Sequence, residues 1–366
     1  MPLTYHMLDY IHEGPRALEK TLEANAEKAE EIAGLVKKGD FERIIVTGMG
    51  SSYTASVMAA PLLVWHSPAP VQVVESSEFG NLPARLVNNK TMVIAVSRSG
   101  ERGAVSQAVE QAAQQGAAVV AVTGVAGSSI TRPARSVMVT AEGPEMTFPK
   151  TKSVLACAGL LMRVAVALAE ANDEAAGRQR VELKNMPGVL ERVLDSIEPE
   201  LCRLMPEIER TELLAIAGSG SNYGVALEAA LKIQEASGVP SYGNGTNAFL
   251  NGPLGAMNSK WLVIPLITSR DRELSEKVLR IARHLGAHTL AVTEPGVSLS
   301  EAPEHCLSLP AKVDALLAAL AFLPPIQLLA YYRTVARGLN PDAPASMQSI
   351  LEAILPPGRE EPELRK

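Results

Sequence analysis

The stretch VTGMGSSY at residues 46–53 recurs later in the chain as IAGSGSNY at residues 216–223. The two stretches are separated by 170 positions, since Gly48 aligns with Gly218 (218 − 48 = 170). The same spacing, without a gap, aligns Ser99 with Ser269, Gly116-Ala117 with Gly286-Ala287, and AVT at 121–123 with AVT at 291–293. One match could arise by chance, but a shared register over this distance indicates two copies of one domain.

Each copy alternates short apolar runs with helical patterns. In the first copy we expect strands at 43–48, 70–76, 91–97 and 118–124, with helices at 51–66 and 100–116. Continuous apolar strands separated by helices are typical of a parallel sheet that is covered on both faces. The sequence therefore predicts an α/β protein with two doubly wound, flavodoxin-like parallel-sheet domains in tandem.

The domain boundaries follow from this repeat. We expect an N-terminal helical segment at 1–35, a first, phosphate-binding domain at 36–185, a helical connector at 186–208, a second domain at 209–340 and a C-terminal tail at 341–366. The apolar segment 315–332 could be mistaken for a membrane span, but Pro324 and Pro325 interrupt it. We predict instead a helix that is buried in the core or in a subunit interface.

Composition excludes several classes of protein. The 366 residues are 47% apolar and 20% charged, which is an ordinary globular balance, and the net charge of −6 argues against a nucleic-acid-binding surface. Cys157, Cys202 and Cys306 are scattered and form no zinc-binding pattern, so reduced thiols are expected. The N-terminus has no signal-peptide pattern. We therefore expect a cytoplasmic protein without membrane or nucleic-acid partners.

Two loops of the first copy have the composition of a phosphate site. The sequence SRSGE at 97–101 follows a predicted buried strand and precedes a helix, where hydroxyls and free backbone N–H groups can hold a phosphate. The loop 48–53 ends a neighbouring strand, and ligands of such sheets bind outside the carboxyl ends of the strands. Arg98 and Arg102 could add positive charge. Ordinary turn residues and solvated arginines are the competing interpretation.

The glycine loop GMGSSY does not match the common nucleotide motifs. No Gly-Lys-Ser/Thr follows, as a Walker A loop requires, and the third glycine of a dinucleotide fingerprint is missing. A nucleotide-dependent oxidoreductase is therefore a weak hypothesis.

The second copy carries a polar stripe on one predicted helix. Glu228, Lys232 and Glu235 are spaced at i, i+4 and i+7, so they share one face. From the spacing alone, a solvated row of ion pairs is the better interpretation, and a catalytic site is the alternative.

Several of these stretches resemble one family. GMGSSYTAS at 48–56, SRSGE at 97–101 and LEAALKIQEAS at 227–237 with NGPLGAM at 251–257 are similar to the tandem sugar isomerase (SIS) domains of phosphosugar isomerases. The likeness is greatest to the isomerase half of glutamine–fructose-6-phosphate amidotransferase and to its free-standing relatives, which include sugar-phosphate deaminases. It covers nearly the whole chain. Met1 is followed by Pro2 rather than by a cysteine nucleophile, so we expect no glutaminase reaction.

The resemblance implies roles for particular residues. The phosphate site corresponds to Gly50, Ser51, Ser52, Ser97, Arg98 and Ser99, with Arg102 where the family usually has threonine. Glu228, Lys232 and Glu235 match the polar active-site face. Glu235 matches the base that moves a proton between C1 and C2 of an open-chain sugar phosphate, a task that suits a carboxylate. No metal or cofactor is implied.

The chain also departs from the family at several positions. The ring-opening histidine is Asn251, the C-terminal lysine aligns with Ser349, and Lys150 stands where the family often has serine. None of the six histidines lies in a matched catalytic loop, so we expect them to be surface or packing residues. The enzyme could take an acyclic substrate or one with an amine at C2, other groups could open the ring, or the chain could only bind its sugar phosphate.

The resemblance thus predicts an aldose–ketose isomerase, or an isomerising deaminase, that acts on a hexose or amino-hexose 6-phosphate, such as fructose or glucosamine 6-phosphate. Because the relatives are dimers with shared sites, we expect a homodimer. The alternative is a non-catalytic phosphosugar sensor, although the chain has no basic DNA-binding module of the kind that such sensors often carry.

Overall fold

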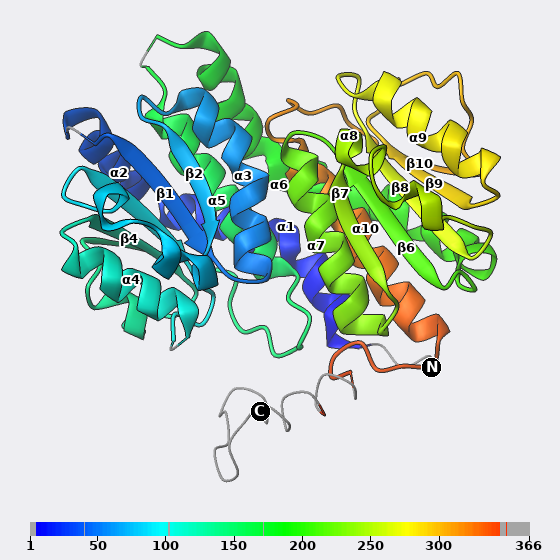
Figure 1. The fold of residues 1–366 in the computed structure, drawn as a ribbon, viewed down its shortest axis with the longest axis horizontal. Helices are drawn as coiled ribbons and strands as arrows, with labels where there is room; N and C mark the ends of the chain where they lie inside the picture. The colour runs from blue at the N-terminus through cyan, green and yellow to red at the C-terminus, as the bar shows by residue number, and fades with distance from the viewer. Residues whose placement is uncertain (1–4, 40, 102, 171, 345–348, 350–366) are drawn as a thin grey trace.

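The computed structural model describes residues 5–39, 41–101, 103–170, 172–344 and 349. Two five-stranded sheets lie side by side, one in each copy, and every strand pairing in them is parallel (Figure 1). The predicted tandem α/β architecture is therefore confirmed.

The two sheets have the same strand order. The first, β2-β1-β3-β4-β5, consists of β1 (Arg43–Gly48), β2 (Val71–Glu75), β3 (Thr91–Val96), β4 (Ala118–Thr123) and β5 (Ser136–Val139). The second, β7-β6-β8-β9-β10, consists of β6 (Leu213–Gly218), β7 (Ser241–Gly245), β8 (Trp261–Ile267), β9 (His288–Thr293) and β10 (His305–Ser308). Strands β1 and β6 have the same length and begin 170 positions apart (213 − 43 = 170), so the repeat seen in the sequence is a repeat of structure.

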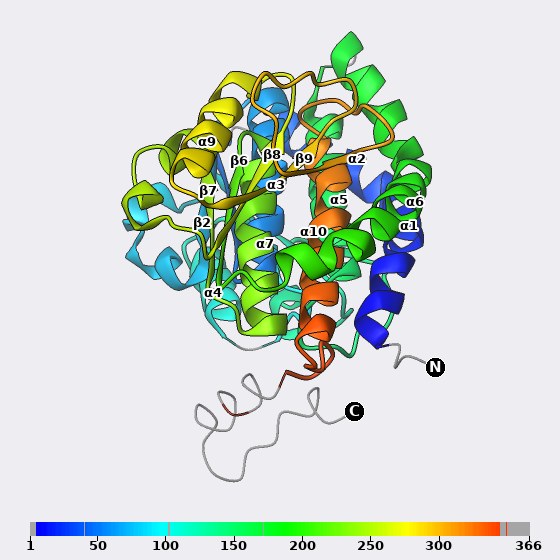
Figure 2. The same cartoon turned by 90° about the vertical axis from the view of Figure 1, so that its right-hand side faces the viewer.

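Helices cover both faces of each sheet. They are α1 (His6–Ala24), α2 (Ala26–Lys38), α3 (Ser51–His66), α4 (Ala104–Gln114), α5 (Lys152–Leu168), α6 (Glu174–Ile208), α7 (Ser221–Ser237), α8 (Thr246–Phe249), α9 (Arg272–His284) and α10 (Ala318–Ala336). Helices α4 and α9 lie on one face of the sheets, and α3, α5, α7 and α10 lie on the other. Helices α1, α2 and α6 form a further layer outside the second group (Figure 2).

The central strands are apolar because both of their faces are buried, whereas β7 (SYGNG) and β10 (HCLS) at the edges of the second sheet are more polar and partly exposed. In β1, Ile44 and Val46 point into a core that is continuous across the two copies, while Ile45 points into a separate cluster beneath α4. This two-sided burial produces the uninterrupted apolar runs from which the strands were predicted.

Helices α3 and α7 pack against each other at the boundary between the copies (Figure 1). The contact is close at Gly224, where a Cβ atom would lie 2.5 Å from the backbone nitrogen of Met58. Because the backbones approach so closely, the amino end of α3 comes within reach of side chains on α7.

Helix α6 joins the copies and is longer than the expected connector, since it begins at Glu174 rather than near residue 186. Asp173 caps it by accepting the backbone N–H groups of Ala175 (2.8 Å) and Ala176 (3.1 Å). The hydrogen bond from Ala176 is the main cause that lowers the pKa of Asp173. In the N-terminal segment, α2 likewise runs past residue 35 to Lys38.

The prediction of a buried helix in the apolar segment 315–332 is confirmed by α10, although Pro324 and Pro325 do not interrupt it as expected. Proline removes backbone hydrogen bonds from a helix, but α10 is buried along its length between α6 and α7, and that packing holds it together. Its Arg333 is fully buried and donates to the carbonyls of Ile208 (2.7 Å) and Thr211 near the end of α6. No helix in the described part of the chain is long and apolar enough to cross a membrane.

Candidate active site

The first loop of the candidate site joins β1 to α3 and requires glycine twice. A Cβ atom on Gly48 would lie 2.8 Å from the backbone carbonyl carbon of Ser52, and Gly50 has a φ of +54°, which favours glycine. The loop reverses the chain sharply, and α3 begins at once with Ser51 and Ser52. Two hydroxyls and the free N–H groups of the helix start therefore lie at the carboxyl edge of the first sheet.

The second loop leaves the neighbouring strand β3. The Ser97 hydroxyl accepts the backbone N–H of Gly100 (3.1 Å), and the Ser99 hydroxyl accepts that of Glu101 (3.4 Å). Each hydroxyl keeps its own proton for donation to a ligand. No described residue accepts the backbone N–H of Arg98 or Ser99. The loop therefore offers both hydroxyl and amide donors to an anion.

A cavity of about 200 Å³ lies beside these loops. The residues that line it come from both copies: Met49, Ser51, Ser52, Arg98, Lys150, Ser153, Val154, Cys157, Lys232 and Glu235. Of the predicted site residues, the structure thus brings Ser51, Ser52, Arg98, Lys150, Lys232 and Glu235 together around one space.

The polar stripe on α7 is a buried ion cluster. Glu228 and Lys232 are almost fully shielded from solvent, and 18% of the Glu235 side chain is exposed. The Lys232 Nζ atom lies 3.5 Å from Glu228 Oε1 and makes a close ion pair with Glu235 Oε2. This arrangement contradicts the interpretation of the stripe as a solvated row of surface ion pairs.

Burial shapes the protonation of this cluster. Loss of water raises the pKa of Glu228, although Lys232 and the hydroxyl of Thr54 oppose the rise. Burial by itself would lower the pKa of Lys232, but the carboxylates of Glu235 and Glu228 outweigh it and the pKa is raised. Lys232 is therefore held as a cation between two acidic side chains.

Glu228 connects the cluster to the first copy. Its Oε1 atom accepts from the Ser51 hydroxyl (3.0 Å), and its Oε2 atom accepts from the Thr54 hydroxyl (2.5 Å). Both donors belong to the first turn of α3. The loop with the hydroxyl donors and the helix that carries Glu235 are thus joined by hydrogen bonds across the boundary between the copies.

Several neighbours of the cavity escaped the sequence analysis. Glu142 is buried, and its Oε1 atom lies 4.0 Å from Arg98 Nε. Glu145 is also buried and caps α5, where it accepts from the backbone of Thr151 (2.6 Å) and the hydroxyl of Ser153 (2.5 Å). Nothing in their spacing marks these carboxylates, because they lie in a loop that no repeat or helical period indicates.

Cys157, which also lines the cavity, is not a candidate nucleophile. Burial is the main cause that raises the pKa of its thiol, so the reactive thiolate is disfavoured. Lys150 lines the same cavity and donates from Nζ to the backbone carbonyls of Glu145 (3.2 Å) and Thr147 (2.6 Å).

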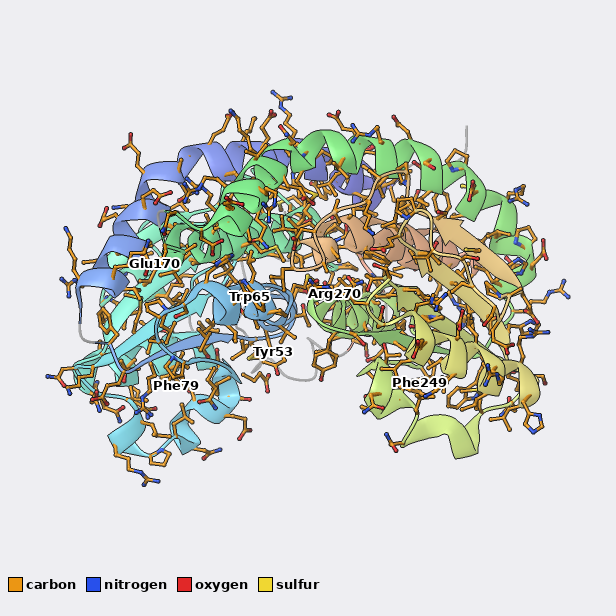
Figure 3. The ribbon with its side chains drawn as sticks, turned by 90° about the horizontal axis from the view of Figure 1, so that it is seen from above. Tyr53, Trp65, Phe79, Glu170, Phe249 and Arg270 are labelled. Atoms are coloured by element: carbon orange, nitrogen blue, oxygen red, sulfur yellow. The ribbon has the colours of Figure 1, made fainter. Side chains whose placement is uncertain are left out.

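Other predicted residues lie elsewhere. Asn251 is exposed in the second copy, does not line the cavity, and donates to the carbonyl of Asn247 (2.8 Å). Phe249, close to it in sequence, is well separated from Tyr53 at the start of α3 (Figure 3). Arg102 lies outside the described residues.

The matching loops of the second copy are filled by the protein's own carboxylates. The backbone N–H and the hydroxyl of Thr268 both donate to Asp271 Oδ1 (2.8 Å each), and the backbone N–H of Ser269 donates to Glu294 (2.9 Å). Ser221, the match of Ser51, donates its hydroxyl to the carbonyl of Ala315 (3.0 Å). The backbone N–H groups that are open at Arg98 and Ser99 of the first copy are therefore occupied at Thr268 and Ser269 of the second.

Comparison with known proteins places the chain in a family. The SIS domain model matches residues 40–167 and 208–337, which correspond to the two structural copies. The chain therefore belongs to the SIS domain family.

Individual relatives agree with this assignment. The chain is 30% identical over 354 residues to a glutamine–fructose-6-phosphate aminotransferase (isomerizing) from Thermococcus kodakarensis, with 94% of this chain and 57% of that protein covered. The chain thus spans little more than half the length of this relative.

Solved structures share the fold. The C-terminal domain of glucosamine-fructose-6-phosphate aminotransferase from Francisella tularensis superimposes with a TM-score of 0.83 at 20% identity, covering 93% of this chain and 99% of that one. Glucosamine-6-phosphate deaminase from Thermotoga maritima gives a TM-score of 0.73 at 20% identity, covering 93% and 97%.

Proposed function

We propose that the chain is a phosphosugar isomerase or isomerising deaminase that acts on an amino-hexose 6-phosphate. The observation that carries the proposal is the shared cavity, in which Glu235 of the second copy faces Ser51, Ser52 and Arg98 of the first. The SIS family membership and the names of the relatives support the same chemistry.

In this proposal the first copy binds the phosphate. Ser51 and Ser52 donate from the start of α3, Ser97 and Ser99 donate from the loop after β3, and the Arg98 guanidinium supplies positive charge. The sugar carbons then extend toward α7. A second subunit of a homodimer completes the site, and the exposed Asn251, which does not line the cavity of its own chain, hydrogen-bonds a sugar hydroxyl there.

Glu235 is the proposed proton shuttle. It removes the proton from C2 of an open-chain aldose phosphate, which gives an enediol, and returns that proton to C1, while the hydroxyl proton moves from O2 to O1. With an amine at C2 the intermediate is an enolamine. Protonation at C1 then gives a C2 imine, and water hydrolyses the imine to the ketose phosphate and ammonia.

Deuterium exchange tests the proposal. The protein is incubated in deuterated water with fructose 6-phosphate, glucosamine 6-phosphate and related esters, and label at C1 and C2 is measured. We expect label with at least one ester and a loss of about 10²-fold or more in Glu235→Gln, the usual contribution of a positioned base. Tight binding without exchange across the panel would instead identify a phosphosugar sensor.

A further inference from the structure

The hydroxyl of Ser51 donates to a buried carboxylate and also lies beside the proposed phosphate site. Ser51 lines the cavity, where a phosphate group would bind, and it also donates to Glu228 Oε1 at 3.0 Å. Glu228 itself is fully buried and does not line the cavity. A serine hydroxyl has a single proton, so it can donate to Glu228 or to a ligand but not fully to both.

The Glu228 oxygen that accepts from Ser51, Oε1, is also the one that lies nearest to Lys232. Glu228 Oε1 lies 3.5 Å from Lys232 Nζ, whereas Oε2 is satisfied by the hydroxyl of Thr54 at 2.5 Å. Lys232 at present lies closer to Glu235 than to Glu228. If Ser51 turned away, Lys232 would be the remaining donor within reach of Glu228 Oε1.

A buried carboxylate that loses a donor strongly favours a replacement, because no water compensates it. Lys232 is flexible at its end and carries three N–H donors, so a small movement of Nζ can serve Glu228. Any such movement weakens its contact with Glu235.

We propose that a phosphate bound at Ser51 draws this hydroxyl away from Glu228, that Lys232 moves toward Glu228, and that Glu235 is thereby released to act as a base. Only hydrogen bonds change partners, and no proton is transferred. Ser51 is therefore a positioning residue: phosphate binding at Ser51 weakens the ion pair between Lys232 and the base Glu235. The proposal rests on the proposed function, since it assigns Glu235 the role of the base.

The test separates the phosphate from the sugar. Deuterium uptake at C1 and C2 of the neutral sugars glucosamine and fructose is measured with and without sodium phosphite, which mimics the missing phosphate group. In the wild type we expect phosphite to raise exchange by about tenfold or more, part of the usual contribution of a positioned base.

Two variants give different results under the proposal. In Ser51→Ala, Glu228 Oε1 has permanently lost its hydroxyl donor, so exchange without phosphite rises to about the phosphite-stimulated rate and phosphite adds little. The matched control is Ser221→Ala, which removes the corresponding hydroxyl of the second copy; that hydroxyl donates to the carbonyl of Ala315 (3.0 Å) and does not line the cavity. This control leaves both the basal rate and the phosphite stimulation unchanged.

Thermal unfolding shows whether each variant is folded, and Ser51→Gly, which also removes the hydroxyl donor, replaces Ser51→Ala if the latter is not folded. A low basal rate and no stimulation in the folded Ser51 variant would show that Ser51 is only a phosphate ligand and would overturn the proposal. A second result would also overturn the proposal: the wild type exchanges phosphorylated sugars, but phosphite does not stimulate exchange of the neutral sugars. In that case the proposed function stands. No exchange with any phosphorylated sugar would remove the proposed function itself.

Discussion

Helices α3 and α7 occupy equivalent places in the two copies but have opposite chemistry. At positions 170 apart, Glu228 of α7 corresponds to Met58 of α3 (228 − 170 = 58). In the same way Lys232 corresponds to Leu62, and Glu235 corresponds to Trp65. Thr54 of α3 donates a hydrogen bond to Glu228 of α7. The equivalent pair with the copies exchanged is Gly224 of α7 and Met58 of α3, which make an apolar contact. The same contact between the helices is therefore polar in one pair and apolar in the other.

The loops that follow strands β3 and β8 also differ between the two copies. The first copy leaves hydroxyl and amide donors open, whereas the second fills its own with Asp271 and Glu294. Glu294 corresponds to Gly124 of the first copy (294 − 170 = 124). The open loop thus lies in one copy and the charged helix face in the other. This division supports the proposed single site, whose cavity is lined by residues of both copies.

The largest expected effect comes from Lys232→Met, compared with Leu62→Met at the matching position of α3. Removing the ammonium leaves the buried Glu228 and the neighbouring Glu235 without their cation, so the free energy of unfolding should fall by about 3–5 kcal/mol. Leu62→Met exchanges one apolar side chain for another and should cost less than about 1.5 kcal/mol. Urea unfolding measures both, and equal losses would contradict the assignment of a charged cluster to α7 alone.

A smaller effect is expected from Thr54→Val, which removes the donor to Glu228 Oε2 at the boundary between the copies. A hydrogen bond to a charged group contributes about 1.5–3 kcal/mol, and urea unfolding should show a loss of this size. Thr54→Ser keeps the hydroxyl and is the control. A loss as large in Thr54→Ser would mean that the methyl group, rather than the hydrogen bond, holds the copies together.

The paired variants Ser99→Ala and Ser269→Ala compare the two loops directly. We expect Ser99→Ala to weaken binding of a hexitol 6-phosphate, which cannot isomerise, by about tenfold, since it removes one donor to a charged group. Ser269→Ala should leave the affinity unchanged. Titration calorimetry measures both, and a loss in Ser269→Ala alone would assign ligand binding to the second copy.

The smallest effect concerns the filled loop of the second copy. Burial, as the main cause, raises the pKa of Asp271, and its Oδ2 atom is buried without a hydrogen-bond partner. A carboxyl group with a raised pKa in the folded state stabilises the protein below its ordinary pKa of about 3.9, and this contribution is lost as the pH rises through the folded pKa.

The free energy of unfolding of the wild type, relative to Asp271→Asn, should therefore fall as the pH rises from about 4 toward neutrality. Urea unfolding of both proteins across this range measures the difference. A difference that stays constant, or grows with pH, would contradict the burial of an unsatisfied carboxylate in this loop.

The sequence predicted the fold well because its signals are local and repeated. The helix at 51–66 and the strand at 43–48 have the bounds of α3 and β1, since a glycine pair and a change of hydrophobic period mark their ends. The prolines of α10 were misread because packing on both sides of that helix outweighs a local preference.

The candidate site was less accessible to sequence reasoning. The spacing of Glu228, Lys232 and Glu235 indicated one helical face but could not show that α3 buries it. The contact between Thr54 and Glu228 spans 174 positions, and no local pattern encodes such a pair. Glu142 escaped for a similar reason, because its approach to Arg98 joins two loops that are 44 positions apart (142 − 98 = 44).

A crystal structure of the chain with a hexitol 6-phosphate tests the central claim most directly. The account predicts one ligand per chain, with its phosphate on Ser51, Ser52 and the loop after β3, and with C1 or C2 about 3 Å from the Glu235 carboxylate. It also predicts no phosphate at Thr268–Asp271. A phosphate bound in that second loop, or sugar carbons beyond the reach of Glu235 from either subunit, would contradict it.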